Sequence, residues 1–373
     1  MDKMPKWADV VLVPVVSLLL AAIISVIVFL SVGQDPWEAI KLMAFGAVGT
    51  SDFLGYTLFY ATNFIFTGLA VAVAFHASLF NIGGEGQVLV GGLGAAIVSL
   101  FIPWPHWTLA LLAGGMAAAV FGALWVAIPA YLQARRGSHI VITTIMFNFM
   151  ASGLLVYMLS DALRPAGQMQ TATAIFPEAT HLPSLNDIAG LFGSELFGRS
   201  PVNISIFIAL LACVGVWLLI WHTRLGYQIR AFGQSESAAK YAGISAVNIT
   251  MIALLISGAL AGMMAVNNTM GINTPQLVDN AAGGAGFIGI AVALMGRNHP
   301  VGIIIAALLF GALYQGGAEL SAATSIPVQI VVVIQALVIM FTGALDQMVR
   351  SPIEGLFLRF GRKGVGAPAA VKE

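Results

Sequence analysis

Apolar segments long enough to cross a membrane recur along the whole chain, and they constrain its fold more than any other feature. A helix needs about 20 apolar residues to cross roughly 30 Å of hydrocarbon. Of the 373 residues, 59% are hydrophobic and 9% are charged, whereas a soluble domain carries about 25% charged residues. The sequence therefore predicts an all-α integral membrane protein whose solvent is lipid.

About ten transmembrane helices are expected between residues 10 and 344, within a single domain formed by residues 1–373. The predicted spans lie near residues 10–31, 57–80, 87–102, 107–132, 139–160, 203–221, 249–267, 285–297, 300–317 and 327–344. The third and eighth are short and are interrupted by glycine or proline. They are expected to be broken or re-entrant, which a membrane tolerates only where the backbone faces protein or water.

The distribution of Lys and Arg among the short loops predicts how the chain is oriented. These residues gather in alternate connections, which the positive-inside rule assigns to the cytoplasm. Both termini are then cytoplasmic, as are the connection at about 222–248 and the tail at 345–373. The connection at about 161–202, which contains four prolines, is external and is expected to form a water-facing lid or docking surface.

Two stretches of the chain resemble each other at a fixed offset. AAAVFGALW, residues 117–125, is similar to IAALLFGALY, residues 305–314, which places Phe121 and Phe310 189 residues apart. Residues 143–159 and 331–345 correspond at nearly the same offset. Spans two to five and seven to ten are thus predicted to be two internal repeats of inverted topology, a pattern typical of transporters with a pathway at the repeat interface.

A polar, glycine-rich stretch, FNIGGEGQ at residues 80–87, interrupts the apolar pattern between the second and third spans. A carboxylate in hydrocarbon costs about 2.5–3.5 kcal/mol on insertion scales, and glycines allow the backbone to turn and expose its polar groups. One interpretation is a break between half-helices at a gate or pathway. The other is a cytoplasmic turn in which Glu85 is solvated or caps the next span.

A second break, NNTMGINTPQLVDNAAGGAGF, occupies residues 267–287. It contains a G-x-G-x-x-G pattern at 284–289, but no strand precedes it, so flexible backbone or close helix packing is expected instead of nucleotide binding. The G-x-x-x-G pattern of Gly258 and Gly262 likewise predicts close packing.

Single polar residues, mostly amides, lie within the predicted spans. Examples are Asn63, His76, Asn148, Gln315 and Gln335. Each alone is explained by interhelical hydrogen bonding, but as a set they favour a neutral, hydrogen-bonding cargo over an ion or proton relay. The candidate pathway residues are Asn63, Asn81, Glu85, Gln87, Asn148, Asn267, Asn268, Asn273 and Gln315.

Several functions are disfavoured by composition. Sixteen basic and sixteen acidic residues balance, which disfavours nucleic-acid binding. One cysteine, Cys213, allows no disulfide or zinc site, and no metal site is expected. The chain has neither a phosphate-binding G-x-x-x-x-G-K-[ST] loop nor a catalytic cluster, so neither enzymatic activity nor a cofactor is expected, and the chain cannot bind ATP by that route.

The predicted cytoplasmic connection HTRLGYQIRAFGQSESAAKYAGISAVN, residues 222–248, is polar and favours helix. An amphipathic stretch here is expected to lie against another protein or against lipid headgroups, although a solvated connector is the alternative.

FNIGGEGQ together with LGYQIRAFGQSESAAKYAGIS resembles the permease subunits of bacterial ATP-binding-cassette importers, in the group for branched-chain amino acids, ribose and nucleosides. The resemblance covers about residues 55–345, and the N-I-G-x-E-G-Q form is closest to the nucleoside branch. The second stretch resembles the element that contacts the ATPase. The resemblance assigns ATPase coupling to Gly226, Arg230, Gly233, Ala238, Ala239 and Gly243.

The resemblance also implies the surroundings of the chain. A second permease subunit, often a related but different chain, two ATPase subunits and an extracytoplasmic binding protein are expected as partners, in the cytoplasmic membrane of a bacterium. The implied cargo is a nucleoside. The alternatives are a permease for a sugar such as ribose, or for branched-chain amino acids, and an ion-coupled secondary transporter, while an integral-membrane enzyme is disfavoured.

Overall fold

The computed structural model of the chain describes residues 12–31, 33, 35–190, 197–324, 326 and 328–341. These residues form helices, loops and two isolated bridges, and the described part contains no β-strand, which confirms the all-α prediction. They cluster into two compact units, one within residues 42–320 and one from the described residues on either side. The predicted single domain stays a prediction, and the predicted tail at 345–373 lies outside the described residues.

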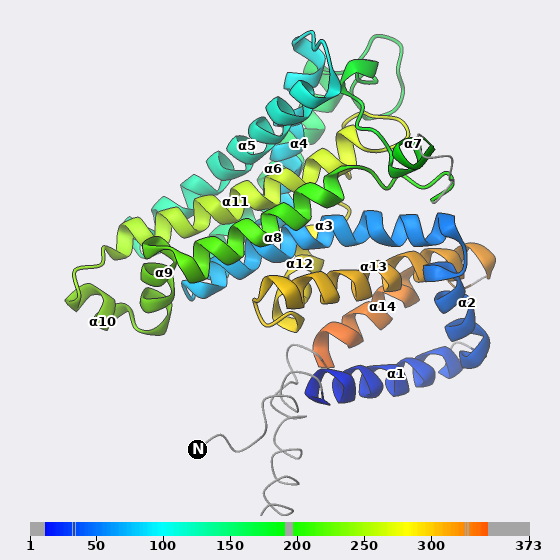
Figure 1. The fold of residues 1–373 in the computed structure, drawn as a ribbon, viewed down its shortest axis with the longest axis horizontal. Helices are drawn as coiled ribbons and strands as arrows, with labels where there is room; N and C mark the ends of the chain where they lie inside the picture. The colour runs from blue at the N-terminus through cyan, green and yellow to red at the C-terminus, as the bar shows by residue number, and fades with distance from the viewer. Residues whose placement is uncertain are drawn as a thin grey trace, which may run out of the picture. The chain divides into compact units, whose positions relative to one another are not determined.

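The larger unit contains most of the helices (Figure 1). They are α3 (Ser51–His76), α4 (Gly84–Phe101), α5 (Trp107–Arg136), α6 (Ile140–Tyr157), the short η2 (Met158–Ala162) and η3 (Glu178–Thr180), α7 (Leu185–Gly190), α8 (Ser205–His222), α9 (Arg224–Gln234), α10 (Glu236–Tyr241), α11 (Ala246–Met270) and α12 (Ala285–Met295). In Figure 1, α9 and α10 lie at one end of this bundle and α7 lies at the opposite end.

The smaller unit is built around α1 (Val13–Ser31), which packs against α14 (Val328–Ile339). Two helices, α2 (Pro36–Val48) and α13 (Pro300–Ala323), run across the boundaries between the units. The sequence pattern did not predict α2, because Trp37, Glu38 and Lys41 interrupt its apolar residues.

Each of the ten predicted spans coincides with a helix in the structure. Within the described residues, seven helices are long and apolar enough to cross a membrane, or eight if α1 and α2 form one bent span. The eighth predicted span is the 11-residue α12, which rises about 16 Å at 1.5 Å per residue and cannot cross alone. The count of about ten therefore stays a prediction.

Small residues bring the central helix α11 close to its neighbours. Gly258 and Gly262 lie directly against the backbone of Gly122 on α5, and Gly262 also contacts Gly91 on α4. A β-carbon at any of these positions would overlap a neighbouring helix. The predicted close packing of the G-x-x-x-G pair is thus confirmed, in the manner usual for helices that associate in lipid.

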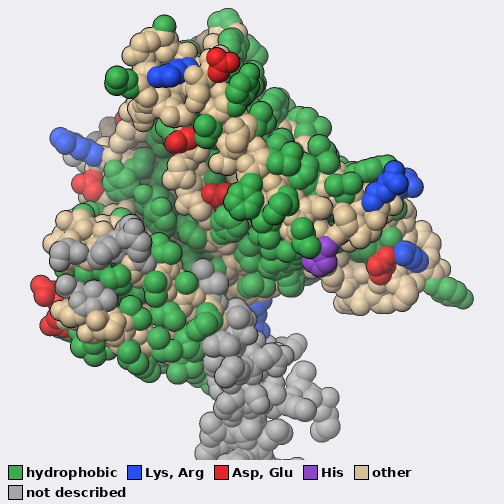
Figure 2. Space-filling model, turned by 180° about the vertical axis from the view of Figure 1, so that it is seen from behind, with side chains coloured by type: hydrophobic (Ala, Val, Ile, Leu, Met, Phe, Trp, Pro, Cys, Tyr) green, Lys and Arg blue, Asp and Glu red, His purple; other side chains and the backbone are tan. Residues whose placement is uncertain are grey.

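The outer faces of the bundle are apolar. Along α5, Leu112, Met116, Val120 and Leu124 recur at helical spacing and are exposed, as expected for side chains that contact lipid. Figure 2 shows hydrophobic side chains over most of this face, whereas Lys and Arg gather toward its ends, including the end formed by α9 and α10.

The order of elements repeats along the chain. A long helix, a helix that follows a glycine-rich break, and a further long helix form α3–α4–α5 and again α11–α12–α13. The middle helices, α4 with 18 residues and α12 with 11, both begin at a G-G-x-G sequence, at residues 83–86 and 283–286. This order agrees with the predicted repeats of spans two to five and seven to ten.

Candidate functional site

The FNIGGEGQ stretch, called the first break below, connects two helices. Helix α3 ends at His76 and α4 begins at Gly84. The intervening residues are mostly buried, with Asn81 2% exposed, and Gln87 at the start of α4 is 1% exposed. The polar side chains of this segment therefore face protein, while its location at a pathway or at the cytoplasmic surface stays a prediction.

The segment lies alongside α12. One end of α12 lies at the level of His76, whose ring nitrogen Nε2 is 3.1 Å from the carbonyl oxygen of Asn298 just beyond α12. The other end of α12 lies against Gly84 and Glu85. Since α12 has 11 residues and is therefore about 16 Å long, Glu85 lies about that far along the bundle from His76.

Paired amides satisfy the polar groups of this buried segment. Asn81 and Gln87 exchange two hydrogen bonds of 3.1 Å, and Asn81 also donates to the hydroxyl of Ser257 on α11 at 2.9 Å. Asn81 Oδ1 accepts from the amide of Gly83 at 2.9 Å. These contacts replace the water that an irregular backbone would otherwise need.

Asn148 on α6 fixes the segment from the opposite side. Its Oδ1 accepts a hydrogen bond from the amide of Gly86, and its Nδ2 donates to the carbonyl of Ile82, both at 2.9 Å. One side chain thus satisfies a donor and an acceptor at the break, and either group unpaired in hydrocarbon would cost several kcal/mol.

Glu85 caps the N-terminus of α12, although it belongs to α4. Its two carboxylate oxygens accept hydrogen bonds from the amides of Gly284 and Gly286, at 2.8 and 2.9 Å. The expectation that Glu85 caps the next span is wrong, because the helix that it caps lies about 200 residues further along the chain. The carboxylate therefore joins α4 to α12.

A second amide cluster lies toward the α7 end of the bundle. The Asn267 side chain donates to Asn63 Oδ1 at 2.7 Å and accepts from Asn203 at 2.8 Å and from Ser205 at 2.6 Å. Asn63 in turn donates to Asn268 Oδ1 at 2.9 Å. The cluster links α3, the start of α8, and α11.

The second break is held by the same cluster. Asn268 Nδ2 donates to the carbonyl of Ala281 at 2.7 Å. Residues of the predicted external lid also contact this segment: Thr173 exchanges hydrogen bonds of 3.0 and 3.1 Å with Leu277. The lid therefore packs on the backbone that leads to α12.

Aromatic side chains of α3 and α13 contact each other. The rings of Tyr60 and Tyr314 are 4.4 Å apart between centroids, and the centroids of Phe64 and Tyr314 are 6.1 Å apart. Three aromatic rings thus gather between these two helices.

The structure brings most predicted pathway residues into these two clusters. Asn81, Gln87 and Asn148 surround the first break, and Asn63, Asn267 and Asn268 surround the second. Gln315 is buried on α13 next to Tyr314, whereas Asn273 is exposed in the loop before α12. Their role in the pathway stays a prediction.

Sequence reasoning missed several members of the site. Asn203 and Ser205 lie at the very start of a predicted span, where a polar residue is unremarkable, and Ser257 is one of many small polar residues in apolar helices. Tyr314 follows the FGAL sequence that occurs in both repeats, and this position was the one sequence feature that could have indicated it.

The predicted coupling connection folds into α9 and α10. Thr223 and Ser235 cap the two helices, since their hydroxyls accept from the amides of Gly226 and Ala238. Helix α9 turns Ile229 and Phe232 inward, and α10 buries Ala239. Tyr241 at the end of α10 is 97% exposed, so it is available to a partner.

The glycines assigned to coupling allow α9 to pack closely. Gly226 lies against the carbonyls of Leu219 and Ile220, and Gly233 lies against the carbonyl of His76 at the end of α3. The hydroxyl of Ser78, at the start of the break, donates to the Gly233 carbonyl at 2.6 Å. Helix α9 is therefore attached to the segment that leads to Glu85.

Gly243, with φ of 81°, adopts the left-handed conformation that ends α10.

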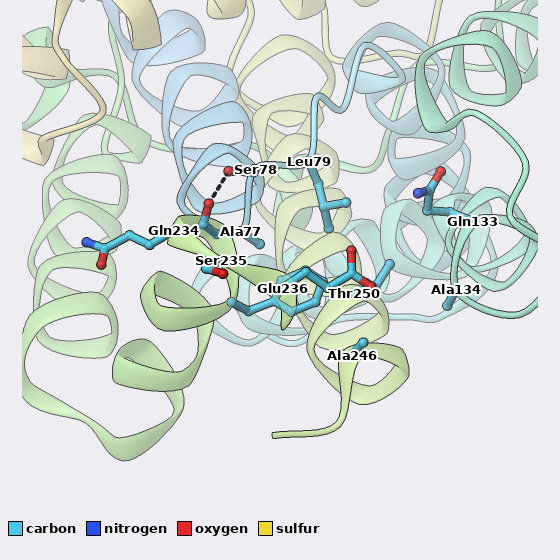
Figure 3. A pocket seen from close by; sticks show the side chains of 12 residues that line it. Ala77, Ser78, Leu79, Gln133, Ala134, Gln234, Ser235, Glu236, Ala246 and Thr250 are labelled. Carbon is cyan, nitrogen blue, oxygen red and sulfur yellow. Dashed lines mark hydrogen bonds between the residues drawn. The ribbon is translucent and has the colours of Figure 1, made fainter. Parts of the chain in front are cut away.

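A cavity of about 270 Å³ lies where α9, α10 and the break meet, and Figure 3 shows the side chains that line it. Ser78 and Leu79 line it from the break, Gln133 from α5, and Glu236 from α10. The Oε1 atom of Gln133 is buried without a hydrogen-bond partner among the described residues. The Nε atom of Arg230, a residue of α9 assigned to coupling, is likewise buried without a hydrogen-bond partner among the described residues.

Among the described residues, no group of three or more His, Cys, Asp or Glu side chains is placed to hold a metal ion. The site is instead built from amides, backbone groups, aromatic rings and one carboxylate.

Comparison with known proteins gives one family. The family model described as "Branched-chain amino acid transport system / permease component" matches residues 53–343. The guanosine ABC transporter permease protein NupP of Bacillus subtilis is 35% identical over 91% of this chain and 95% of its own length. The nucleoside ABC transporter permease protein NupB of Lactococcus lactis is 34% identical over 89% of this chain and 90% of its own.

A third relative has a different cargo in its name. The glucose ABC transporter permease protein TsgB13 of Haloferax volcanii is 33% identical over 95% of this chain and 92% of its own length. No solved structure matches the chain significantly.

Proposed function

The chain belongs to the family of branched-chain amino acid transport system permease components, and we propose that it forms the translocation path of an ATP-binding-cassette importer for nucleosides. Members of this family are components of transporters and not enzymes. Its several apolar helices make it a multi-pass membrane protein, and the proposed location is the cytoplasmic membrane of a bacterium.

The similarity to NupP and NupB over nearly the whole chain carries the nucleoside proposal. The site around the two breaks agrees with this cargo, because it offers amides and aromatic rings, which suit a neutral molecule with hydrogen-bonding edges and a planar ring. The similarity to TsgB13 favours a hexose as the second candidate. A sugar would use the amides but has no planar ring.

The geometry of α9 and α10 supports coupling to an ATPase. These helices project from one end of the bundle (Figure 1) and pack through Gly233 on the segment that leads to Glu85. A displacement of α9 would thus be transmitted to that segment. We place two ATPase subunits against this end, a second permease subunit beside the chain, and a binding protein at the opposite end. ATP is bound by the ATPase subunits, and this chain needs no cofactor.

Uptake by the reconstituted importer tests the proposal. The chain is co-expressed with its partner subunits, placed in vesicles that contain ATP, and given radiolabelled adenosine, ribose or glucose with the cognate binding protein. Adenosine uptake that needs ATP and survives an uncoupler is expected. Uptake of glucose alone would support the second candidate, and uptake abolished by an uncoupler but indifferent to ATP would contradict ATPase coupling.

The coupling role is tested separately by Arg230→Glu and Tyr241→Ala. Both are expected to weaken co-purification of the ATPase or to cut uptake, while cargo affinity of the binding protein is unchanged. The matched control is Tyr157→Ala, since Tyr157 is exposed on α6 away from this end. Normal uptake by a well-expressed Arg230→Glu variant would refute the role of α9.

A further inference from the structure

We propose that Tyr60 and Tyr314 form a stacking site for the planar ring of the cargo. This inference rests on the proposed nucleoside function and specifies how the chain would recognise such a cargo. None of the pathway residues expected from sequence is aromatic, so the site is additional to them.

The two rings face each other across α3 and α13. Their centroids are 4.4 Å apart and their planes are tilted by 49°. Phe64, one turn further along α3, is buried and contacts Tyr314 edge-on at 6.1 Å with a 68° angle. Phe64 therefore supports Tyr314 from one side, whereas both tyrosines stay partly exposed.

The hydroxyl groups distinguish this pair from ordinary core packing. A buried tyrosine usually directs its hydroxyl to a hydrogen-bond partner. Both tyrosines are partly exposed, and within the described part of the chain no hydrogen bond holds the Tyr60 or the Tyr314 hydroxyl. Phenylalanine would fill the same space, so the two phenols remain available to a bound molecule.

The position of the pair also fits a point on the pathway. Tyr60 and Phe64 flank Asn63 on α3, and Asn63 belongs to the amide cluster of the second break. Asn63 contacts Asn267 and Asn268, the residues with which that break begins. The rings thus lie beside the second break, and transporters built from repeats bind their cargo beside such discontinuous helices.

In the present structure the rings of Tyr60 and Tyr314 are too close together to hold a third ring between them. A ring held between two others needs about 7 Å between the outer planes, since carbon atoms pack at about 3.5 Å. At 4.4 Å there is no room for it. Binding therefore requires α3 and α13 to separate at this level, and a cargo that stacks between the rings would favour the separated state over the closed one.

Stacking would give the site its selectivity. Each base stacked on an aromatic side chain gains affinity by about 5- to 150-fold. A purine presents a larger flat surface than a pyrimidine, and a pentose presents none. The pair is therefore expected to favour purine nucleosides over pyrimidine nucleosides, and both over the free sugar.

The test measures uptake selectivity in vesicles that contain the complete importer with saturating binding protein. Tyr314→Met and Tyr60→Met remove one ring each but keep most of its volume, and Tyr314→Phe keeps the ring without its hydroxyl. Tyr157→Met is the matched control, because Tyr157 is an exposed tyrosine on the outer face of α6. Stimulation of ATP hydrolysis by the loaded binding protein reports whether each variant assembles.

Either Met variant is expected to lower the ratio of adenosine to uridine uptake by about fivefold or more, at the low end of base–aromatic stacking. Tyr314→Phe and Tyr157→Met should leave the ratio within about twofold. An unchanged ratio in an assembled Met variant would overturn the stacking site alone. If Tyr314→Met does not assemble, Tyr60→Met applies the same test from α3. A wild-type importer that takes up ribose but neither nucleoside would overturn the stacking site and the nucleoside function together.

Discussion

Gly286 lies directly against the backbone of Glu85, and its amide donates a 2.9 Å hydrogen bond to the Glu85 carboxylate. Two helix N-termini, each with a partial positive charge, thus meet at one carboxylate. This arrangement explains why an acidic residue is tolerated so deep in an apolar bundle, since its charge is placed against two helix dipoles and two backbone donors. It also makes Glu85 a link between the two repeats.

Replacement of Glu85 by Gln should loosen this link. Glutamine has one carbonyl oxygen where glutamate has two, so either Gly284 or Gly286 loses its acceptor, and an unpaired buried amide costs about 1–3 kcal/mol. We expect a thermal midpoint several degrees lower and uptake reduced about tenfold or more. Glu38→Gln, at an exposed position on α2, is the control. Wild-type stability and uptake in Glu85→Gln would contradict the structural role of the carboxylate.

Gly286→Ala tests the close approach of the two helices. A β-carbon at this position would overlap the amide nitrogen and Cα of Glu85, and both are backbone atoms that cannot rotate away. The helices must then separate, so a loss of uptake and a destabilisation of about 1–3 kcal/mol are expected. At Gly215 on α8 a β-carbon would meet no atom within 4 Å, and Gly215→Ala should therefore behave as wild type. Equal thermal midpoints for the two variants would be evidence against the tight contact.

Asn148→Asp and Asn148→Leu test how the buried segment is held. The aspartate keeps an acceptor for Gly86 but cannot donate to the Ile82 carbonyl, and the leucine can do neither. Protease cleavage or hydrogen exchange in residues 77–87 should therefore increase in both variants, more so in the leucine variant. Asn248→Leu, at an exposed position on α11, should leave this segment protected. Unchanged protection in Asn148→Leu would show that other contacts suffice.

The helices and the breaks could be predicted because each follows from local physics. Lipid offers no hydrogen bonds, so an apolar run of sufficient length must be helical, and a cluster of glycine with Asn, Glu and Gln marks a point where the helix stops. For this reason the break between His76 and Gly84 was found within a few residues, while α2, a short helix with charges in it, was not.

The partners of the polar residues could not be predicted, because they depend on pairing across the fold. Glu85 binds amides about 200 residues away, and those donors are backbone groups of glycine, which carry no mark in the sequence. Asn203 joins Asn267 and Asn63 only because the start of α8 lies beside α11 and α3. Sequence patterns indicate which residues need a partner in the membrane, and only the packing of helices decides which partner each one has.

Gly233→Ala should uncouple the ATPase from the membrane segment. The new β-carbon would overlap the His76 carbonyl and push α9 away from the end of α3. We expect basal ATP hydrolysis and ATPase association to persist, but stimulation by cargo-loaded binding protein to fall at least about tenfold, because α9 would no longer move the break. Gln234→Ala, one residue further on and exposed, is the control. Full stimulation in Gly233→Ala would rule out transmission through this contact.

The predicted orientation can be tested with the native cysteine in place. Cys213 is buried within α8, so it should react poorly with a membrane-impermeant maleimide from either side. A cysteine introduced at Ser237, exposed at the start of α10, should react only in inside-out vesicles. One at Met169, which is 97% exposed in the predicted external connection, should react only in right-side-out vesicles or intact cells. Wild-type protein carried through the same labelling gives the background from Cys213. The opposite pattern would place α9 and α10 on the external face, where they could not reach an ATPase, and the coupling proposal would fail with the topology.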